Sequence, residues 1–231
     1  MKRKLAVVLL ICISCHIGWA AQDFVWKSGQ NMKVVCDTTE APVVKVALDL
    51  LKRDCRSVLS GEISRSESIG NIYVGTWGES SVLQVLADTR QLDVAQLDEH
   101  KEAFLLNVLP DGRLVVAGSD KRGTAYGVLE LSRMMGVSPW EWWADAVPEK
   151  KEEFRLPAGF RKLDYPQVAY RGIFINDEDW GLTPWSWKHY EPSERKGQIG
   201  PKTHARIFEL LLRLRANTFW PAMHECSIPF F

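Results

Sequence analysis

Acidic side chains follow a short apolar segment near residue 175, and they are the first candidates for chemistry. Residues 170–175 are expected to form a strand, and Asn176, Asp177, Glu178 and Asp179 come directly after it. Side chains alternate across an extended segment, so Asp177 and Asp179 would lie on one side and Glu178 on the other. Carboxyl groups at the end of a barrel strand suit catalysis. Helix capping and a solvated loop explain the same cluster equally well.

A second polar cluster follows the next expected strand, residues 217–220. His224 and Glu225 come shortly after Trp220. The strong apolar periodicity of residues 201–215 predicts a helix between the two strands, which is the order of a βα unit. Both clusters would then face the same rim. The His-Glu pair lacks HExxH spacing, so no zinc site is predicted, and a structural histidine and a solvated carboxylate remain the alternatives.

The chain has ten tryptophans, and six of them fall into two groups. The groups are Trp140, Trp142 and Trp143, and Trp180, Trp185 and Trp187. Aromatic rings offer large, rigid surfaces on which sugars can stack, so the second group suits carbohydrate binding or ordinary loop packing. The first group is interpreted as packing between two domains of the chain.

The residues before this region are expected to form a small α/β domain with a mixed sheet, residues 22–147. Pro42 suits the first turn of a helix that Gly61 ends, and Pro110-Asp111-Gly112 is turn chemistry between two apolar strands. The segment from Gly118 to Thr124 lacks the Walker pattern and is interpreted as a turn into a helix over 125–135 that ends at Gly136. Strands are also expected at 32–36 and 71–75, and a weaker helix around 82–86.

The segment 148–168 is charged and contains prolines, and we interpret it as a linker. Residues 169–231 would then begin a (β/α)₈ barrel. From Tyr170 to Phe231 there are 62 residues, whereas such a barrel needs about 250. The expectation is therefore an incomplete barrel, with two strands and one helix.

The N-terminus has the pattern of a secretory signal peptide, predicted for residues 1–21. Basic residues precede the uncharged apolar run Leu5–Ile13, and small residues follow it. The run is short for a membrane span, so an uncleaved anchor is the less favoured alternative. The protein is expected to be exported to the periplasm or outside the cell, and lipoprotein anchoring through Cys15 is disfavoured because Cys12, not an aliphatic residue, lies three positions before it.

Composition excludes several classes of function. The formal net charge is zero, so there is no general basic field for nucleic acid. Cysteine spacing fits neither a disulfide framework nor a zinc site. One bridge between Cys36 and Cys55 is conceivable, but buried free thiols are favoured because both lie in apolar patterns.

Two long segments carry a specific resemblance. RGIFINDEDWGLTPW and GPKTHARIFELLLRLRANTFWPAMHE are similar to the start of the catalytic barrel in glycoside hydrolase family 115, the xylan α-glucuronidases. A third segment, GSDKRGTAYGVLELSRMMGVSPWEWWADAVPEK, resembles the accessory α/β domain that precedes the barrel there and in other glycosidases.

The resemblance implies removal of glucuronic acid, or its 4-O-methyl form, from glucuronoxylan by inverting hydrolysis without metal or cofactor. One carboxylic acid would protonate the leaving oxygen and a second would activate water. The matching positions suggest Asp177, Glu178 and Glu225 as catalytic residues. The positions that would contact substrate are Asn176, Asp179, Trp180, Trp220 and His224.

The remaining active-site carboxylates and an arginine are implied to come from later strands, and a homo-oligomer is possible in the full-length enzyme. Three hypotheses stay open from the sequence. The chain is part of a xylan α-glucuronidase, a non-catalytic carbohydrate-binding remnant, or an inactive truncation.

Overall fold

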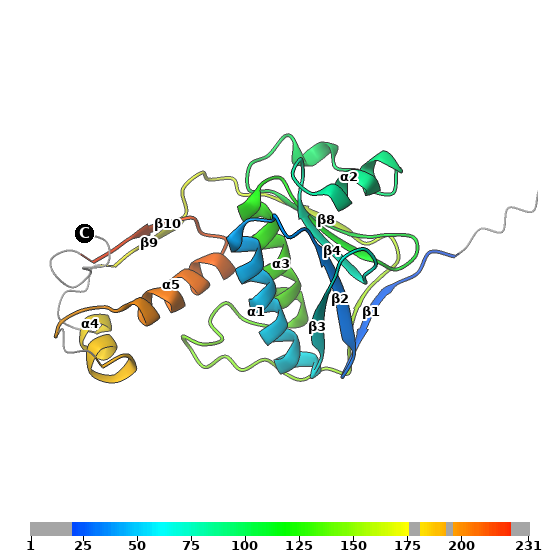
Figure 1. Cartoon of the computed structure of the whole chain (residues 1–231). Coiled ribbons are helices and arrows are strands. Elements are labelled where there is room, and N and C mark those ends of the chain that lie inside the picture. Colours follow the sequence, from blue (N-terminus) through cyan, green and yellow to red (C-terminus); the bar gives the residue numbers. More distant parts are fainter. Residues whose placement is uncertain (1–19, 176–180, 193–195, 223–231) are drawn as a thin grey trace, which may run out of the picture.

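The computed structural model describes residues 20–175, 181–192 and 196–222 (Figure 1). Its strands are β1 (Phe24–Lys27), β2 (Asn31–Cys36), β3 (Glu62–Ser66), β4 (Ile72–Thr76), β5 (Phe104–Val108), β6 (Leu114–Gly118), β7 (Glu153–Leu156), β8 (Arg161–Asp164), β9 (Gly172–Phe174) and β10 (Thr218–Trp220). Its helices are α1 (Pro42–Leu59), α2 (Ser81–Asp88), η1 (Ala95–Leu97), α3 (Lys121–Met135), α4 (Leu182–Trp185), the π-helical η2 (Ser186–Tyr190) and α5 (Pro201–Arg213).

Six strands form one mixed sheet in the order β3-β2-β4-β6-β5-β8. Strands β3, β2, β4 and β6 are parallel, whereas β5 is antiparallel to both β6 and β8. The predicted mixed α/β fold is confirmed, and so is the predicted hairpin, in which Gly112 turns the chain with a φ of 82°. Strands β1 and β7 pair separately and antiparallel. We call β1 to β8 with α1 to α3, residues 24–164, the sheet unit.

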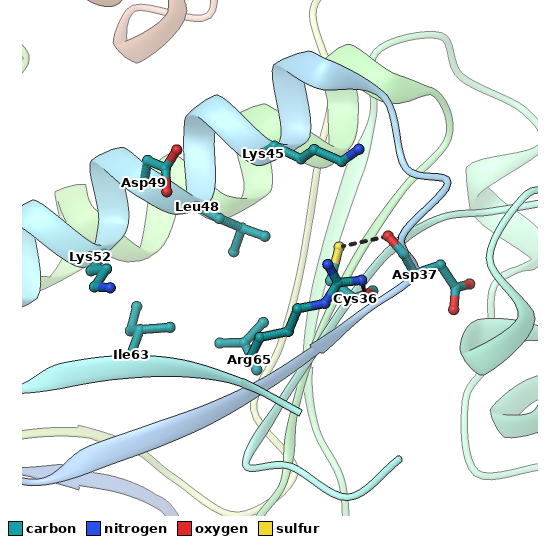
Figure 2. A pocket seen from close by; sticks show the side chains of 9 residues that line it. Cys36, Asp37, Lys45, Leu48, Asp49, Lys52, Ile63 and Arg65 are labelled. Atoms are coloured by element: carbon teal, nitrogen blue, oxygen red, sulfur yellow. Dashed lines mark hydrogen bonds between the residues drawn. The ribbon is translucent and has the colours of Figure 1, made fainter. Parts of the chain in front are cut away.

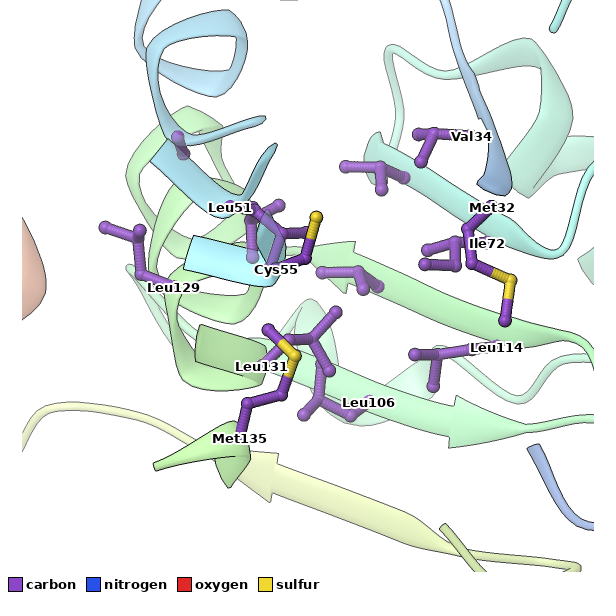
Figure 3. Close-up of a cluster of buried hydrophobic side chains, with 14 of the residues drawn as sticks. Met32, Val34, Leu51, Cys55, Ile72, Leu106, Leu114, Leu129, Leu131 and Met135 are labelled. Carbon is purple, nitrogen blue, oxygen red and sulfur yellow. The ribbon is translucent and has the colours of Figure 1, made fainter. Parts of the chain in front are cut away.

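Helices cover both faces of the six-stranded sheet because its central strands are apolar on both sides. In β6, Leu114 and Val116 join the core under α1 and α3, whereas Val115 and Ala117 join the core under α2 and η1. Successive side chains of a strand point to opposite faces, so one continuous apolar run supplies two cores. In the first core, Leu51 and Cys55 of α1 lie among side chains of α3 and the strands (Figure 3).

Helix α3 begins four residues earlier than predicted, because Asp120 caps it. The Asp120 carboxylate accepts hydrogen bonds from the backbone N–H groups of Arg122 and Gly123, both at 2.9 Å. A Cβ on Gly123 would lie only 2.1 Å from the carbonyl oxygen of Ala103. This glycine therefore permits close packing of helix on strand, in agreement with the turn predicted in place of a phosphate loop. Gly136 ends the helix as predicted, with a φ of 105°.

The segment expected as a linker contains two strands. Strand β7 alternates exposed and buried residues, and its Phe154 packs edge-on against Phe24 of β1. Strand β8 extends the main sheet beside β5. Strand β8 is charged because its lysine and arginine side chains lie on the surface or pair with acids. Lys162, for example, pairs with Glu130.

Two predicted helix ends are also displaced. Helix α1 begins at Pro42 as predicted, but Ser60 takes the left-handed conformation after it, with a φ of 50°, and Gly61 is buried behind it. Helix α5 ends at Arg213, two residues before the predicted end at 215, and Leu214 is 43% exposed. No helix within the described residues is long and apolar enough to cross a membrane.

Cys36 and Cys55 are both buried free thiols, as the sequence favoured. Burial raises the pKa of Cys36 to about 11 and that of Cys55 to about 12. The Cys55 thiol lies 3.2 Å from the carbonyl oxygen of Lys52 and acts as a core residue.

A buried ion pair joins the sheet unit to α5. Asp54 lies in the buried stripe of α1, where an apolar residue would be expected. Arg213 donates two hydrogen bonds to it, at 2.8 and 3.0 Å, and the side chains are 4% and 3% exposed for Arg213 and Asp54. Glu209 then bridges Arg213 and Arg53. A charge at this depth is tolerated only because its partner is there.

We expect Arg213→Met to be strongly destabilising, because it leaves the Asp54 carboxylate buried without its partner. Breaking one side of a buried pair costs about 3–5 kcal/mol. Urea denaturation should show a loss of this size in the free energy of unfolding. The matched control is Arg56→Met, which removes the exposed pair with Glu62 and should cost far less. The double variant Asp54→Leu/Arg213→Met should recover part of the loss, and equal losses for Arg213→Met and Arg56→Met would contradict this account.

Candidate active site

Strands β9 and β10 lie side by side and parallel, with α5 between them in the chain. Gly172 pairs with Thr218 and Phe174 with Trp220. A Cβ on Gly172 would lie 1.8 Å from the carbonyl oxygen of Thr218, so only glycine allows this approach. The predicted strand-helix-strand order is confirmed, and the carboxyl ends of both strands meet at one edge. We call β9, α5 and β10 the βαβ unit.

The two faces of this strand pair differ. On one face, Phe219 packs edge-on against Phe208 of α5, with ring centroids 5.3 Å apart. On the other face, the rings of Phe174 and Trp220 meet at 5.5 Å, and they are 49% and 64% exposed. Tyr170 lies on the same exposed side and is 82% exposed, so an aromatic surface leads up to the edge where both strands end.

The start of both strands is held by Glu102, which lies before β5 and is 5% exposed. Its carboxylate accepts hydrogen bonds from Arg171 and, at 3.0 Å, from the Asn217 amide. Arg122 pairs with it as well. Burial tends to raise the pKa of Glu102, but the hydrogen bonds from Asn217 and Arg171 and the charge of Arg122 hold it below its ordinary value. Glu102 therefore stays ionised and fixes the residues that precede β9 and β10.

Glu130 of α3 anchors the segment between α5 and β10. It is 2% exposed and contacts three cations, Arg133, Lys162 and Arg215, at 2.6 to 2.7 Å. Burial alone would raise its pKa, but hydrogen bonds from these three side chains lower it to about 2. Next to Arg215, the carbonyl oxygen of Ala216 accepts a hydrogen bond from Tyr126.

A further carboxylate, Glu191, caps the other end of α5. It accepts hydrogen bonds from the backbone N–H groups of Lys202 and Thr203, both at 2.9 Å. Burial tends to raise the pKa of Glu191, but these bonds and the Thr203 hydroxyl hold it below its ordinary value. A negative charge is favoured at a helix N-terminus. A Cβ on Gly200 would overlap this carboxylate, which lies 2.4 Å from the position a Cβ would take.

Four aromatic rings form a cluster that joins residues 142–143 to α4 and η2. Trp185 stacks on Tyr190 at 5.0 Å, and Trp142 meets Tyr190 edge-on at 5.0 Å. Trp143 donates a hydrogen bond to the Arg206 carbonyl, while the Arg206 guanidinium lies 4.8 Å above Trp142. Packing between two parts of the chain is confirmed for these two tryptophans.

Trp140, Trp185 and Trp187 differ from Trp142 and Trp143 in their surroundings. Trp140 is 47% exposed. Trp185 is engaged in the ring cluster, so loop packing, not sugar stacking, accounts for it. Trp187 is half-buried, and the Nζ atom of Lys188 lies 5.0 Å from the centroid of its ring.

Of the eight site residues predicted from the sequence, the structure places Trp220, at the end of β10. The other seven lie outside the described residues, and they are Asn176, Asp177, Glu178, Asp179, Trp180, His224 and Glu225. Within residues 20–175, 181–192 and 196–222, no group of three metal-binding side chains could hold a metal ion.

Sequence reasoning missed the residues that position these strands. Glu102 and Glu130 are charged but buried, as Asp54 is in α1. The available signal was a lone acid inside an apolar pattern, as in Ala125–Met135, where Glu130 is the only acid. A buried acid requires a partner, but the pattern does not say which one.

Comparison with known proteins decides the family. The model for glycosyl hydrolase family 115 matches residues 163–230. A solved family GH115 4-O-methyl-α-glucuronidase, with specificity for decorated arabinogalactans, is 60% identical, with a TM-score of 0.85 over 90% of this chain. The chain belongs to glycoside hydrolase family 115. It spans 27% of the length of that enzyme.

More distant structures share the fold of this family 115 chain. The exo-β-N-acetylglucosaminidase of Vibrio harveyi, from family GH20, is 15% identical with a TM-score of 0.50, over 87% of this chain and 23% of that one. The Flavobacterium johnsoniae chitobiase is 12% identical with the same score, over 88% and 26%. A comparison with curated proteins found no match.

The Glu130 anchor predicts an acid-dependent stability. Burial opposes the shift, but hydrogen bonds from Arg133, Lys162 and Arg215 lower the pKa of Glu130 from its ordinary 4.5 to about 2 in the folded chain. Its contribution is therefore complete above about pH 4.5 and is lost as pH falls toward 2, and it is on the order of 3 kcal/mol. We expect Glu130→Gln to lower the free energy of unfolding at pH 7 and to differ little from the parent protein near pH 2.

Urea denaturation across this pH range measures the difference between the two proteins. The exposed Glu67→Gln is the matched control and should show a small difference at every pH. A Glu130→Gln difference that stays constant from pH 7 to pH 2 would contradict the account.

Proposed function

We propose that this chain forms the N-terminal part of an α-glucuronidase that removes glucuronic acid, or its 4-O-methyl form, from a decorated polysaccharide. The observation that carries the proposal is the parallel pairing of β9 and β10. The two polar clusters of the sequence come shortly after these strands, and catalytic residues of barrels come from the carboxyl ends of strands. The 60% identity to an α-glucuronidase supports the same reaction class.

The βαβ unit is proposed to begin a (β/α)₈ barrel, residues 169–231, after an accessory domain at residues 22–147. In such a barrel the helices lie outside the strands. Helix α5 covers the face of Phe219, so the opposite face, with Phe174 and Trp220, would line the interior. This chain spans 27% of the length of its 60% identical relative, and the further strands of the barrel would come from the remainder of that length.

Roles are proposed for the residues at this rim. Asp177, Glu178 and Glu225 would supply the general acid and base of an inverting hydrolysis, which needs two carboxyl groups about 6.5–9.5 Å apart. The substrate-binding residues would be Asn176, Asp179, Trp180, Trp220 and His224. Trp220 supports this assignment because its exposed ring stands beside Phe174 at the end of β10.

Two polysaccharides are candidate substrates. The sequence resemblance implied glucuronoxylan, whereas the 60% identical enzyme has specificity for decorated arabinogalactans. We place decorated arabinogalactan first, because the identity extends over 90% of this chain.

The basic and apolar N-terminus supports export of the protein to the periplasm or outside the cell.

A chimera tests the reaction. Residues 22–231 of this chain would replace the corresponding part of the 60% identical enzyme, and release of 4-O-methylglucuronic acid would be measured from arabinogalactan and from glucuronoxylan. We expect the chimera to release the acid. Residues 22–231 by themselves should release none, since the other carboxylates would come from later strands. A folded chimera that acts on neither polymer would contradict the proposal.

Variants of the chimera test the residues. Loss of a general acid or base lowers the rate by about 10²- to 10⁴-fold, so we expect at least one of Asp177→Asn, Glu178→Gln and Glu225→Gln to fall in this range. The exposed Glu149→Gln is the matched control and should keep full activity. If all three variants retained activity, the catalytic pair would lie on other strands.

The anomeric form of the released sugar tests the stereochemistry. Proton NMR of the first product should show the β-anomer of the uronic acid, because water attacks the face opposite the leaving group. The α-anomer as first product would contradict inversion.

A further inference from the structure

A cavity of about 220 Å³ opens between α1 and the edge of the six-stranded sheet (Figure 2). Its wall comes from one side of α1 and from β2 and β3. Strand β3 lies at one edge of this sheet, beside β2. None of the lining residues belongs to α4, α5, β9 or β10, so the cavity is separate from the candidate active site.

Side chains at regular spacing on α1 and β3 form the cavity wall. Lys45, Leu48 and Lys52 are three and four residues apart on α1 and therefore share one side of the helix. Ile63 and Arg65 are two residues apart on β3 and share one face of the sheet. The side chains of both elements face the same space in Figure 2.

The cavity is lined by one more cationic than acidic side chain. Lys45, Lys52 and Arg65 line it, against the acids Asp37 and Asp49. The Asp37 carboxylate is occupied, because it accepts hydrogen bonds from the backbone N–H of Ser81 at 2.7 Å and from its hydroxyl at 3.1 Å. Asp49 lies on α1 between Lys45 and Lys52 and is part of the same wall (Figure 2).

The cations are also available to a ligand. Within the described residues, the ion pairs of α1 are made by Arg53, Asp54 and Arg56, not by Lys45 or Lys52. The Arg65 guanidinium donates one hydrogen bond, 3.0 Å long, to the carbonyl oxygen of Cys36. This bond holds the head group at the cavity while its other N–H groups can donate to an anion.

The floor of the cavity is apolar and is formed by Val34, Leu48 and Ile63. An apolar floor beneath a cationic rim suits a ring that carries a carboxylate. The volume is below the roughly 300–1,000 Å³ of sites for drug-sized ligands, so one sugar unit is an appropriate size. Arginine recognises a carboxylate with two parallel hydrogen bonds, and lysine adds a point charge.

We propose that this cavity is a non-catalytic binding site for a uronic acid unit. The carboxylate would bind Lys45 and Arg65, and the ring would lie on Leu48 and Ile63. The choice of a uronic acid rests on the proposed function, since an α-glucuronidase meets a polymer that carries many such units. A second attachment point on the same chain would raise the local concentration of polymer near the active site.

Titration calorimetry on the full 231-residue chain tests the site, with D-glucuronate, D-glucose and acetate as probes. We expect glucuronate to bind at least about tenfold more tightly than glucose or acetate, because only glucuronate has both the ring and the charge. Lys45→Gln and Arg65→Gln should each weaken glucuronate binding by about tenfold. The exposed Lys27→Gln, on β1, is the matched control and should bind as the parent chain does.

Three outcomes would overturn the proposal. Equal glucuronate affinity in Lys45→Gln, Arg65→Gln and the parent chain would place binding elsewhere. Acetate binding as tight as glucuronate binding would mean a general anion site, and equal glucose binding would remove the role of the charge. Urea denaturation of each variant confirms that it is folded. Glucuronate binding that depends on Lys45, combined with an inactive chimera, would support this site and reject the proposed function alone.

Discussion

The pairing of buried carboxylates with arginines is the interaction on which the rest of this structure depends. Asp54, Glu102 and Glu130 of the sheet unit are almost inaccessible to water. Arg213 binds the first, Arg171 the second and Arg215 the third. A carboxylate removed from water is costly unless a cation and hydrogen bonds compensate it. The βαβ unit therefore has one favourable position against the sheet unit, and its strand ends are fixed together with it.

The local fold was largely predictable from the sequence. Pro42, Gly112 and Gly136 mark a helix start, a hairpin and a helix end through backbone conformations that they favour, and all three were identified. Strands β1, β3, β7 and β8 were not identified, and the last two lie in the segment interpreted as a linker. Each is short, and β3 is a polar edge strand whose pattern carries little apolar signal. Pairing with distant partners, not local preference, makes these segments extended.

The candidate site was predictable in outline. The order of strand, helix and strand indicated a βα unit, and the parallel register agrees with it. The positioning residues were not predictable, because Asp54 and Arg213 lie 159 residues apart. An acid in an apolar stripe indicates a buried charge that requires a cationic partner, but only the folded structure shows which residue is that partner. For the same reason Trp185, which looked available to a sugar, proved to be occupied by Tyr190.

The aromatic cluster of Trp142, Trp143, Trp185 and Tyr190 has an optical consequence. Rings held at 4.9 to 6.1 Å and at fixed mutual angles sit in an asymmetric environment. Near-ultraviolet circular dichroism responds to such fixed packing and is lost when tertiary contacts loosen. Two of the rings precede β7 and two follow β9. The protein thus contains an intrinsic chromophore that reports whether its early and late segments remain docked.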